Sequence, residues 1–137
     1  MIAMTVWAGL IVSRVLRLAD SLLPSGADCD AMLAAGDGPR LELAEPLALA
    51  ASAHGIEIPR NDDHLRLFLA VRNTAAPVDL NVRGMVVATP DGRLGLTVGR
   101  GRVVESYGAG LTVVIDPGPG RYSEAFRVPG VQLLGGA

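Results

Sequence analysis

The chain has a single cysteine, Cys29, and few aromatic side chains among its 137 residues. One cysteine cannot form an internal disulfide, which excludes a small secreted fold that disulfides hold together. Half of the residues are hydrophobic but only 4% are aromatic, so the core must consist mainly of Leu, Val, Ile and Ala. The length is that of one ordinary domain, which can bury a sufficient core without cross-links.

Lysine is absent, and all 12 basic residues are arginines. The 14 acidic residues balance them and leave a formal net charge of −2. Proteins that bind nucleic acid usually carry a basic stripe, so nucleic acid is not expected as a partner. The opening apolar run, MIAMTVWAGLIV, is shorter than the roughly 20 residues of a membrane-spanning helix. No basic residue precedes it, as one would in a signal peptide, and a membrane partner is not expected either.

The N-terminal segment predicts an amphipathic helix from Thr5 to Leu23 that ends at Pro24, because apolar residues recur there at helical spacing. Three interpretations stay open. The helix docks on the body of the protein or on a neighbouring subunit, it associates with a membrane, or it lies upstream of a natural start at Met32. The predicted organisation is an N-terminal helix over 1–24, a linker over 25–40 and a β-sandwich domain over 41–137.

The body of the chain alternates short apolar runs with Gly and Pro, of which there are 17 and 9. Turn signals every 8–12 residues are typical of an antiparallel β-sandwich or a jelly-roll-like barrel, and a mainly β fold of this class is predicted. The run from Leu47 to Ala53 is ambiguous: its alanines favour a helix, but its close Gly and Pro boundaries favour a short strand, which we prefer. The other predicted strands are 41–45, 56–58, 64–72, 78–88, 94–98, 102–106, 111–115, 126–128 and 131–134.

The clearest pattern is a β-hairpin from His64 to Ala88, which follows an expected turn at 61–63. Apolar and polar residues alternate over 64–72 and again over 78–88, with turn chemistry between the two runs. The parity of the runs places Arg72 opposite Asp79 as an exposed ion pair. The polar face of this hairpin carries Arg66, Arg72 and Arg83, which we predict as a protein contact surface.

No motif predicts a catalytic, cofactor or metal site. The Asp62–His64 trio is adjacent in sequence, and neighbouring strand residues point to opposite faces, so the three side chains do not converge. Cys29 lies in an acidic, linker-like stretch that would raise its pKa rather than activate it. The glycine pairs at 99–102 and 108–110 complete no dinucleotide fingerprint and are interpreted as tight turns. The loop 116–120 carries two prolines and is expected to be rigid.

The order of these features resembles that of small virion structural proteins of tailed phages, particularly those of actinobacterial hosts. The similar segments are LALAASAHGIEIPRNDDHLRLFLAVRNTAAPVDLNV, at 47–82, and YGAGLTVVIDPGPGRYS, at 107–123. In that family an Ala-rich stretch leads through a turn to a strand that ends in Arg-Asn or Lys-Asn, followed by a Val-alternating strand. The resemblance covers 47–134.

The resemblance implies a non-enzymatic capsid, decoration, connector or tail subunit. Such a subunit would assemble in the host cytoplasm into the virion, as a homo-oligomer or with other virion subunits, through many copies of one weak interface. The alternative is a β-sandwich binding module of a bacterial surface or secretion system that recognises glycan or protein. A third class, a small hydrolase, would require a convergent polar pocket, which no residue spacing predicts.

Overall fold

The computed structural model describes residues 6–17, 19–23, 42–72, 74–107, 110–115 and 117–135. These contain three helices and nine strands. The elements are β1 (Val6–Trp7), α1 (Ala8–Leu16), β2 (Ala19–Leu23), α3 (Ala44–Ser52), α4 (Asp62–Val71), β3 (Val82–Ala88), β4 (Leu94–Gly99), β5 (Arg102–Tyr107), β6 (Gly110–Val114), β7 (Glu124–Arg127), β8 (Val131–Gln132) and β9 (Leu134–Gly135).

The main sheet has the strand order β2-β6-β5-β4-β3-β7. The strands from β6 to β7 in this order pair in antiparallel fashion, while β2 adds to the β6 edge in parallel. β9 pairs with the first residues of β3, and β1 and β8 form a separate parallel pair. The mainly β expectation is confirmed in this coarse form. The expected sandwich or jelly-roll-like barrel is not seen, because the sheet formed by the described residues is open.

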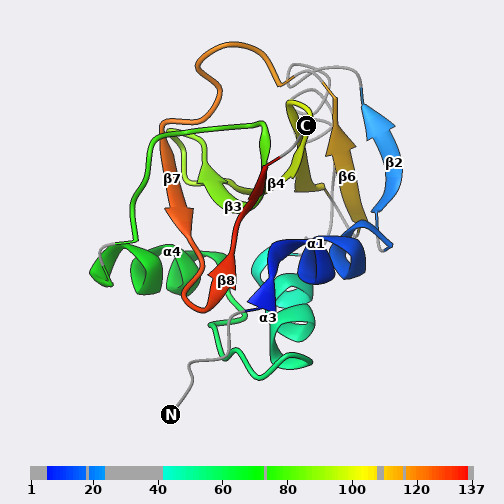
Figure 1. The fold of residues 1–137 in the computed structure, drawn as a ribbon. Coiled ribbons are helices and arrows are strands. Elements are labelled where there is room, and N and C mark those ends of the chain that lie inside the picture. The colour runs from blue at the N-terminus through cyan, green and yellow to red at the C-terminus, as the bar shows by residue number, and fades with distance from the viewer. Residues whose placement is uncertain are drawn as a thin grey trace.

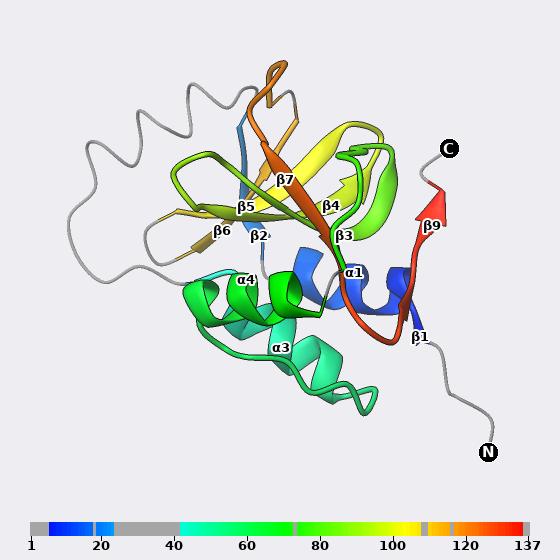
Figure 2. The ribbon, with the colours of Figure 1, turned by 90° about the vertical axis from the view of Figure 1, so that its left-hand side faces the viewer.

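The three helices lie together on one side of the sheet (Figures 1 and 2). The core between the two layers contains Ile11, Val12 and Val15 of α1 together with Leu65 and Leu69 of α4. The sheet contributes every second residue of its strands to this layer, among them Val86, Leu96 and Val104. The first interpretation of the N-terminal helix is therefore the observed one: α1 docks on the body.

The opposite face of the sheet carries a second, smaller core. Met85, Val87, Val103, Tyr122 and Ala125 are buried there. The four of these residues that lie on β3, β5 and β7 alternate with the residues that face the helices. Both faces of the central strands are therefore buried, and β3 and β4 read as nearly continuous apolar runs.

The first half of the predicted hairpin is wrong, because Asp62–Val71 is the helix α4. Asn61 has extended backbone angles and its side chain accepts a hydrogen bond from the His64 N–H at 3.2 Å, which is an N-cap. The Asn-Asp-Asp sequence that we expected to be a turn starts this helix. Leu65 and Leu69, one helical turn apart, are its buried residues.

The expected Arg72–Asp79 pair does not form. Arg72 lies at the end of α4, where its guanidinium carbon is 3.7 Å from the centre of the Phe68 ring. Asp79 instead accepts a hydrogen bond from the Asn81 N–H at 3.0 Å within its own turn. Of the second predicted strand, the part Val82–Ala88 is confirmed as β3.

Four other expectations for the chain before α4 are wrong in whole or in part. The preferred strand at 47–53 lies in α3, which also begins within the expected strand at 41–45. Pro46 lies in the first turn of α3, where the missing N–H has no partner to lose. The predicted helix over 5–23 is helical only from Ala8 to Leu16, and Ala19–Leu23 is the edge strand β2. The residues 56–58 form neither helix nor strand.

The predictions for the C-terminal half are confirmed apart from small shifts of the boundaries. The strands expected at 94–98, 102–106, 111–115 and 126–128 are β4, β5, β6 and β7. The expected closing strand at 131–134 is divided between β8 and β9. The turn at Thr89–Gly92 closes with hydrogen bonds to Thr89, and Gly92 has φ +92°, which favours glycine. The linker 25–40, with Cys29 and Met32, lies outside the described residues.

Candidate functional site

The three arginines predicted as one contact surface do not share a face. Arg66 and Arg72 lie on α4, and six residues of helix place them on different sides of it. Arg66 pairs with Glu124 of β7, and their side chains are 41% and 40% exposed. Arg83 lies on β3 and is half-buried. The three arginines therefore do not form the polar face of a hairpin, because 62–71 is a helix. Their role in a protein contact stays a prediction.

The outer face of α4 is exposed and aliphatic. Leu67 and Val71 are 62% and 71% exposed, and they lie one helical turn apart. His64 and Ala70 are exposed on the same side of the helix. We call these four residues the α4 ridge.

The helices α3 and α4 begin next to each other and cap one another. Asp62, in the first turn of α4, accepts a hydrogen bond from the Ala44 N–H of α3 at 2.8 Å. In return, Glu42 accepts a hydrogen bond from the Asp62 N–H at 3.1 Å and one from the Asn61 amide at 3.4 Å. Each carboxylate therefore satisfies backbone donors at the start of the other helix, where the helix dipole favours negative charge.

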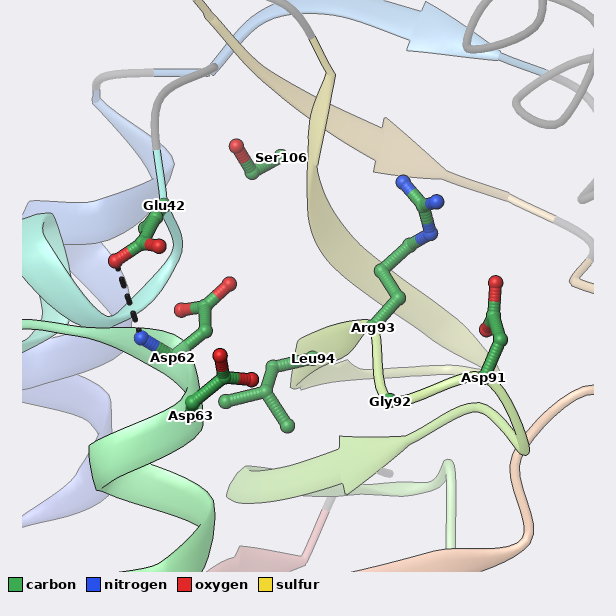
Figure 3. A pocket seen from close by; sticks show the side chains of 8 residues that line it. All are labelled: Glu42, Asp62, Asp63, Asp91, Gly92, Arg93, Leu94 and Ser106. Atoms are coloured by element: carbon green, nitrogen blue, oxygen red, sulfur yellow. Dashed lines mark hydrogen bonds between the residues drawn. The ribbon is translucent and has the colours of Figure 1, made fainter.

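A cavity of about 370 Å³ lies between these helix starts and the sheet. Figure 3 shows Glu42, Asp62 and Asp63 together on its helix side and Arg93 on its sheet side. We call this the acidic cavity; its lining residues are Glu42, Asp62, Asp63, Asp91, Gly92, Arg93, Leu94 and Ser106. Four carboxylates thus face a space that has one guanidinium in its wall.

The carboxylates of the acidic cavity differ in their surroundings. Burial raises the pKa of Asp62 above its ordinary value, and the neighbouring Glu42 and Asp63 carboxylates raise it further. The hydrogen bond from the Ala44 N–H lowers this pKa but does not cancel the increase. The hydroxyl of Thr89 donates to Asp91 and holds the pKa of Asp91 below its ordinary value. The helix wall therefore holds carboxylates that repel one another, and an added positive charge there would relieve the repulsion.

Ser106 closes the top of the acidic cavity. It lies on β5, next to Glu105 but on the opposite face of the strand, toward the helices. Ser106 is 4% exposed, and its hydroxyl oxygen makes no hydrogen bond within the described part of the chain. In Figure 3 its side chain extends from β5 toward the side on which Glu42 lies.

A second polar group is buried in the smaller core. Glu105 is fully buried and accepts two hydrogen bonds from Arg121, from Nε and Nη2, each 2.9 Å long. The Tyr122 hydroxyl also donates to Glu105, and Arg93 Nε lies 3.9 Å from its carboxylate. Burial and the Glu105 carboxylate raise the pKa of Tyr122, so the phenol stays protonated. The arrangement ties residues 121–122 to β5.

The described residues contain no group of three or more His, Cys, Asp or Glu side chains arranged to hold a metal ion. His64 is exposed on the α4 ridge. None of the helices within the described ranges is both long enough and apolar enough to cross a bilayer.

Sequence reasoning missed both polar groups. The acidic cavity depends on two helix starts that we interpreted as strand and turn, although Asn61 followed by two aspartates is also an N-cap signal. The buried Glu105 had a sequence signal: it is a charged residue inside an apolar strand, and such residues are rarely buried without a partner. Its partner Arg121 lies 16 residues away, beyond a Pro- and Gly-rich loop, and no local pattern connects the two.

Comparison with protein-family models, with curated proteins and with solved structures finds no match to this chain.

Proposed function

We propose that this chain is a non-enzymatic structural subunit of a phage-type virion, which assembles in the host cytoplasm with copies of itself or with other virion subunits. Two things support this. The order of turns and apolar runs over 47–134 resembles the virion family, and the α4 ridge offers a surface suited to a second copy of the chain. The observation that carries the proposal is the exposure of Leu67 and Val71 on that ridge.

The two side chains form one aliphatic stripe because they lie at positions i and i+4 of a helix. Fully burying a Leu or Val side chain stabilises by about 1.5–3 kcal/mol, and roughly half of that gain is still available where the side chain is largely exposed. His64 and Ala70 extend the stripe with small or weakly polar groups. A contact through this ridge therefore gains free energy without removing a formal charge from its centre.

The ends of α4 carry opposite charges that suit a two-fold contact. Asp63 lies in its first turn and Arg72 follows its last residue, and both are exposed. When two copies of α4 pack in antiparallel fashion, each Asp63 comes next to the partner copy's arginine end. A two-fold axis makes such a contact self-complementary. One short helix is a small interface, so each contact is weak and a lattice of many copies gives the total affinity.

The test is the oligomeric state, measured by sedimentation and by size-exclusion chromatography with light scattering. The wild type is expected to associate as its concentration rises, and Leu67→Ser is expected to shift it to monomer. Leu49→Ser is the matched control, because Leu49 is 49% exposed on α3, away from the ridge. Asp63→Arg weakens association, and Asp63→Arg combined with Arg72→Asp restores it.

Two results would contradict the proposal. One is a wild type that stays monomeric up to about 1 mM, where an association free energy of only about 4 kcal/mol would be visible. The other is a Leu49→Ser variant that dissociates as readily as Leu67→Ser. The genes beside this one give an independent test, because a virion subunit is expected to lie among capsid or tail genes.

A second candidate is a binding module of a bacterial surface or secretion system, and the acidic cavity is the observation that favours it. Protein is the better ligand class for such a module than glycan. A glycan groove needs exposed aromatic rings, and among the described side chains Phe68 is half-buried while Tyr122 and Phe126 are buried.

A further inference from the structure

The helix wall of the acidic cavity has more negative charge than its structural role requires. Glu42 and Asp62 accept the hydrogen bonds that cap the two helices. Asp63 accepts none of these, yet its carboxylate faces the same space as theirs (Figure 3). Capping therefore explains two of the carboxylates, and the third adds charge that a bound cation would balance.

Ser106 is an independent sign of a ligand. A buried hydroxyl without a hydrogen bond is costly, and most such groups in folded proteins have a partner. Ser106 lines the cavity from the sheet side, opposite the carboxylates. A hydrogen-bond donor bound in the cavity would give this hydroxyl oxygen the partner that it lacks among the described residues.

The size and lining of the cavity favour an organic cation over a metal ion. Its volume of about 370 Å³ is that of a small-molecule site. The described His, Cys, Asp and Glu side chains do not converge tightly enough to coordinate a metal.

We propose that the acidic cavity binds a guanidinium or primary ammonium group carried on an aliphatic chain. The carboxylates of Asp62 and Asp63 accept hydrogen bonds from the cationic head, and Ser106 accepts one more. A planar guanidinium fits this set best, since its five N–H donors form a fork that can reach two carboxylates at once. The cation comes either from an arginine or lysine side chain of a protein or from a free amine, and the two sources share this chemistry.

The test is a titration of the full chain followed by calorimetry and by amide NMR. Three probes are used: N-acetyl-arginine methylamide, its neutral isostere N-acetyl-citrulline methylamide, and n-butylguanidinium as a free cation of the same charge. The arginine probe is expected to bind at least about tenfold more tightly than the citrulline probe, because charge-assisted hydrogen bonds are roughly twice as strong as neutral ones. Binding of n-butylguanidinium equal to that of the arginine probe identifies a free cation as a sufficient ligand, and weaker binding identifies a peptide source.

Variants test which groups make the contact. Asp63→Asn is expected to weaken binding of the arginine probe about fivefold to tenfold, and Ser106→Ala about threefold, from the loss of one hydrogen bond each. Glu57→Gln is the matched control, since it removes an exposed carboxylate outside the cavity. The affinity of this variant for the arginine probe is expected to stay within about twofold of the wild-type value. Ser106 is not part of the α4 ridge, so Ser106→Ala separates this site from the self-association proposed above.

Three results would overturn the proposal. The first is no binding of either cationic probe up to about 10 mM, a concentration that detects affinities weaker than 4 kcal/mol. The second is equal affinity for the arginine and citrulline probes, which would show that charge is not recognised. The third is an effect of Glu57→Gln as large as that of Asp63→Asn, which would indicate attraction to the whole acidic surface.

Discussion

Replacing Glu105 by glutamine tests whether the smaller core depends on its buried charge. The substitution keeps the shape of the side chain but removes the anion between Arg121 and Tyr122. Glu105 is fully buried, and the Arg121 side chain is only 9% exposed. Little water reaches the contact between Arg121 and Glu105, so solvent does not replace the lost charge there.

Breaking a buried ion pair by removing one partner typically costs about 3–5 kcal/mol. That is a large part of the roughly 5–15 kcal/mol by which a domain of this kind is stable. With a urea slope near 2 kcal/mol per molar, the unfolding midpoint of Glu105→Gln is expected to fall by about 2 M. Urea unfolding followed by circular dichroism measures this directly.

Glu124→Gln is the matched control, because it also removes a carboxylate from an arginine partner. The Arg66–Glu124 pair is about 40% exposed on both sides, so its loss should cost at most about 1 kcal/mol. The reasoning is refuted when the two variants lose the same free energy of unfolding, or when Glu105→Gln loses less than about 1 kcal/mol.

Two further predictions concern single positions. Burial raises the pKa of Asp62 in the folded state, so ionisation of this carboxyl weakens folding. Asp62→Asn is therefore expected to gain stability relative to the wild type as the pH rises above about 4, which urea titrations at several pH values measure. The opposite trend would mean that the hydrogen bond from the Ala44 N–H outweighs burial. Gly95→Ala is expected to lose about 1–3 kcal/mol through overpacking, because the new methyl group would meet Val103 Cγ1 at 2.5 Å and Val87 Cγ2 at 3.3 Å. Adding Val103→Ala should recover part of that loss in thermal unfolding, and a wild-type midpoint for Gly95→Ala alone would contradict the packing.

The strands of the C-terminal half could be predicted from sequence because local signals are enough to define them. Each alternating or apolar run there is short and bounded by Gly or Pro, as at Thr89–Gly92 and at Gly99–Gly101. Two tight turns with positive φ values lie at those places. Sequence neighbours also pair in space from β3 to β6, so the order of the strands follows from the chain.

The helix α4 could not be recognised by period alone. Leu65, Leu67, Leu69 and Val71 alternate as in a strand, yet the structure buries only Leu65 and Leu69. A run in which leucine occupies every second position satisfies both periods, and the N-cap at Asn61 decides between them. β2 was missed for another reason: its partner β6 lies far along the chain, and no local pattern reveals a parallel edge pairing.

That pairing affects the order in which the protein forms during synthesis. Residues of β2 leave the ribosome long before β6, and β1 also waits for β8, its parallel partner near the C-terminus. At about 5–20 residues per second, the apolar N-terminal segment stays without its partners for several seconds. Such non-local contacts slow folding and leave apolar segments exposed to misassembly. The N-terminal strands β1 and β2 can therefore pair only after the C-terminal strands β8 and β6 have been made.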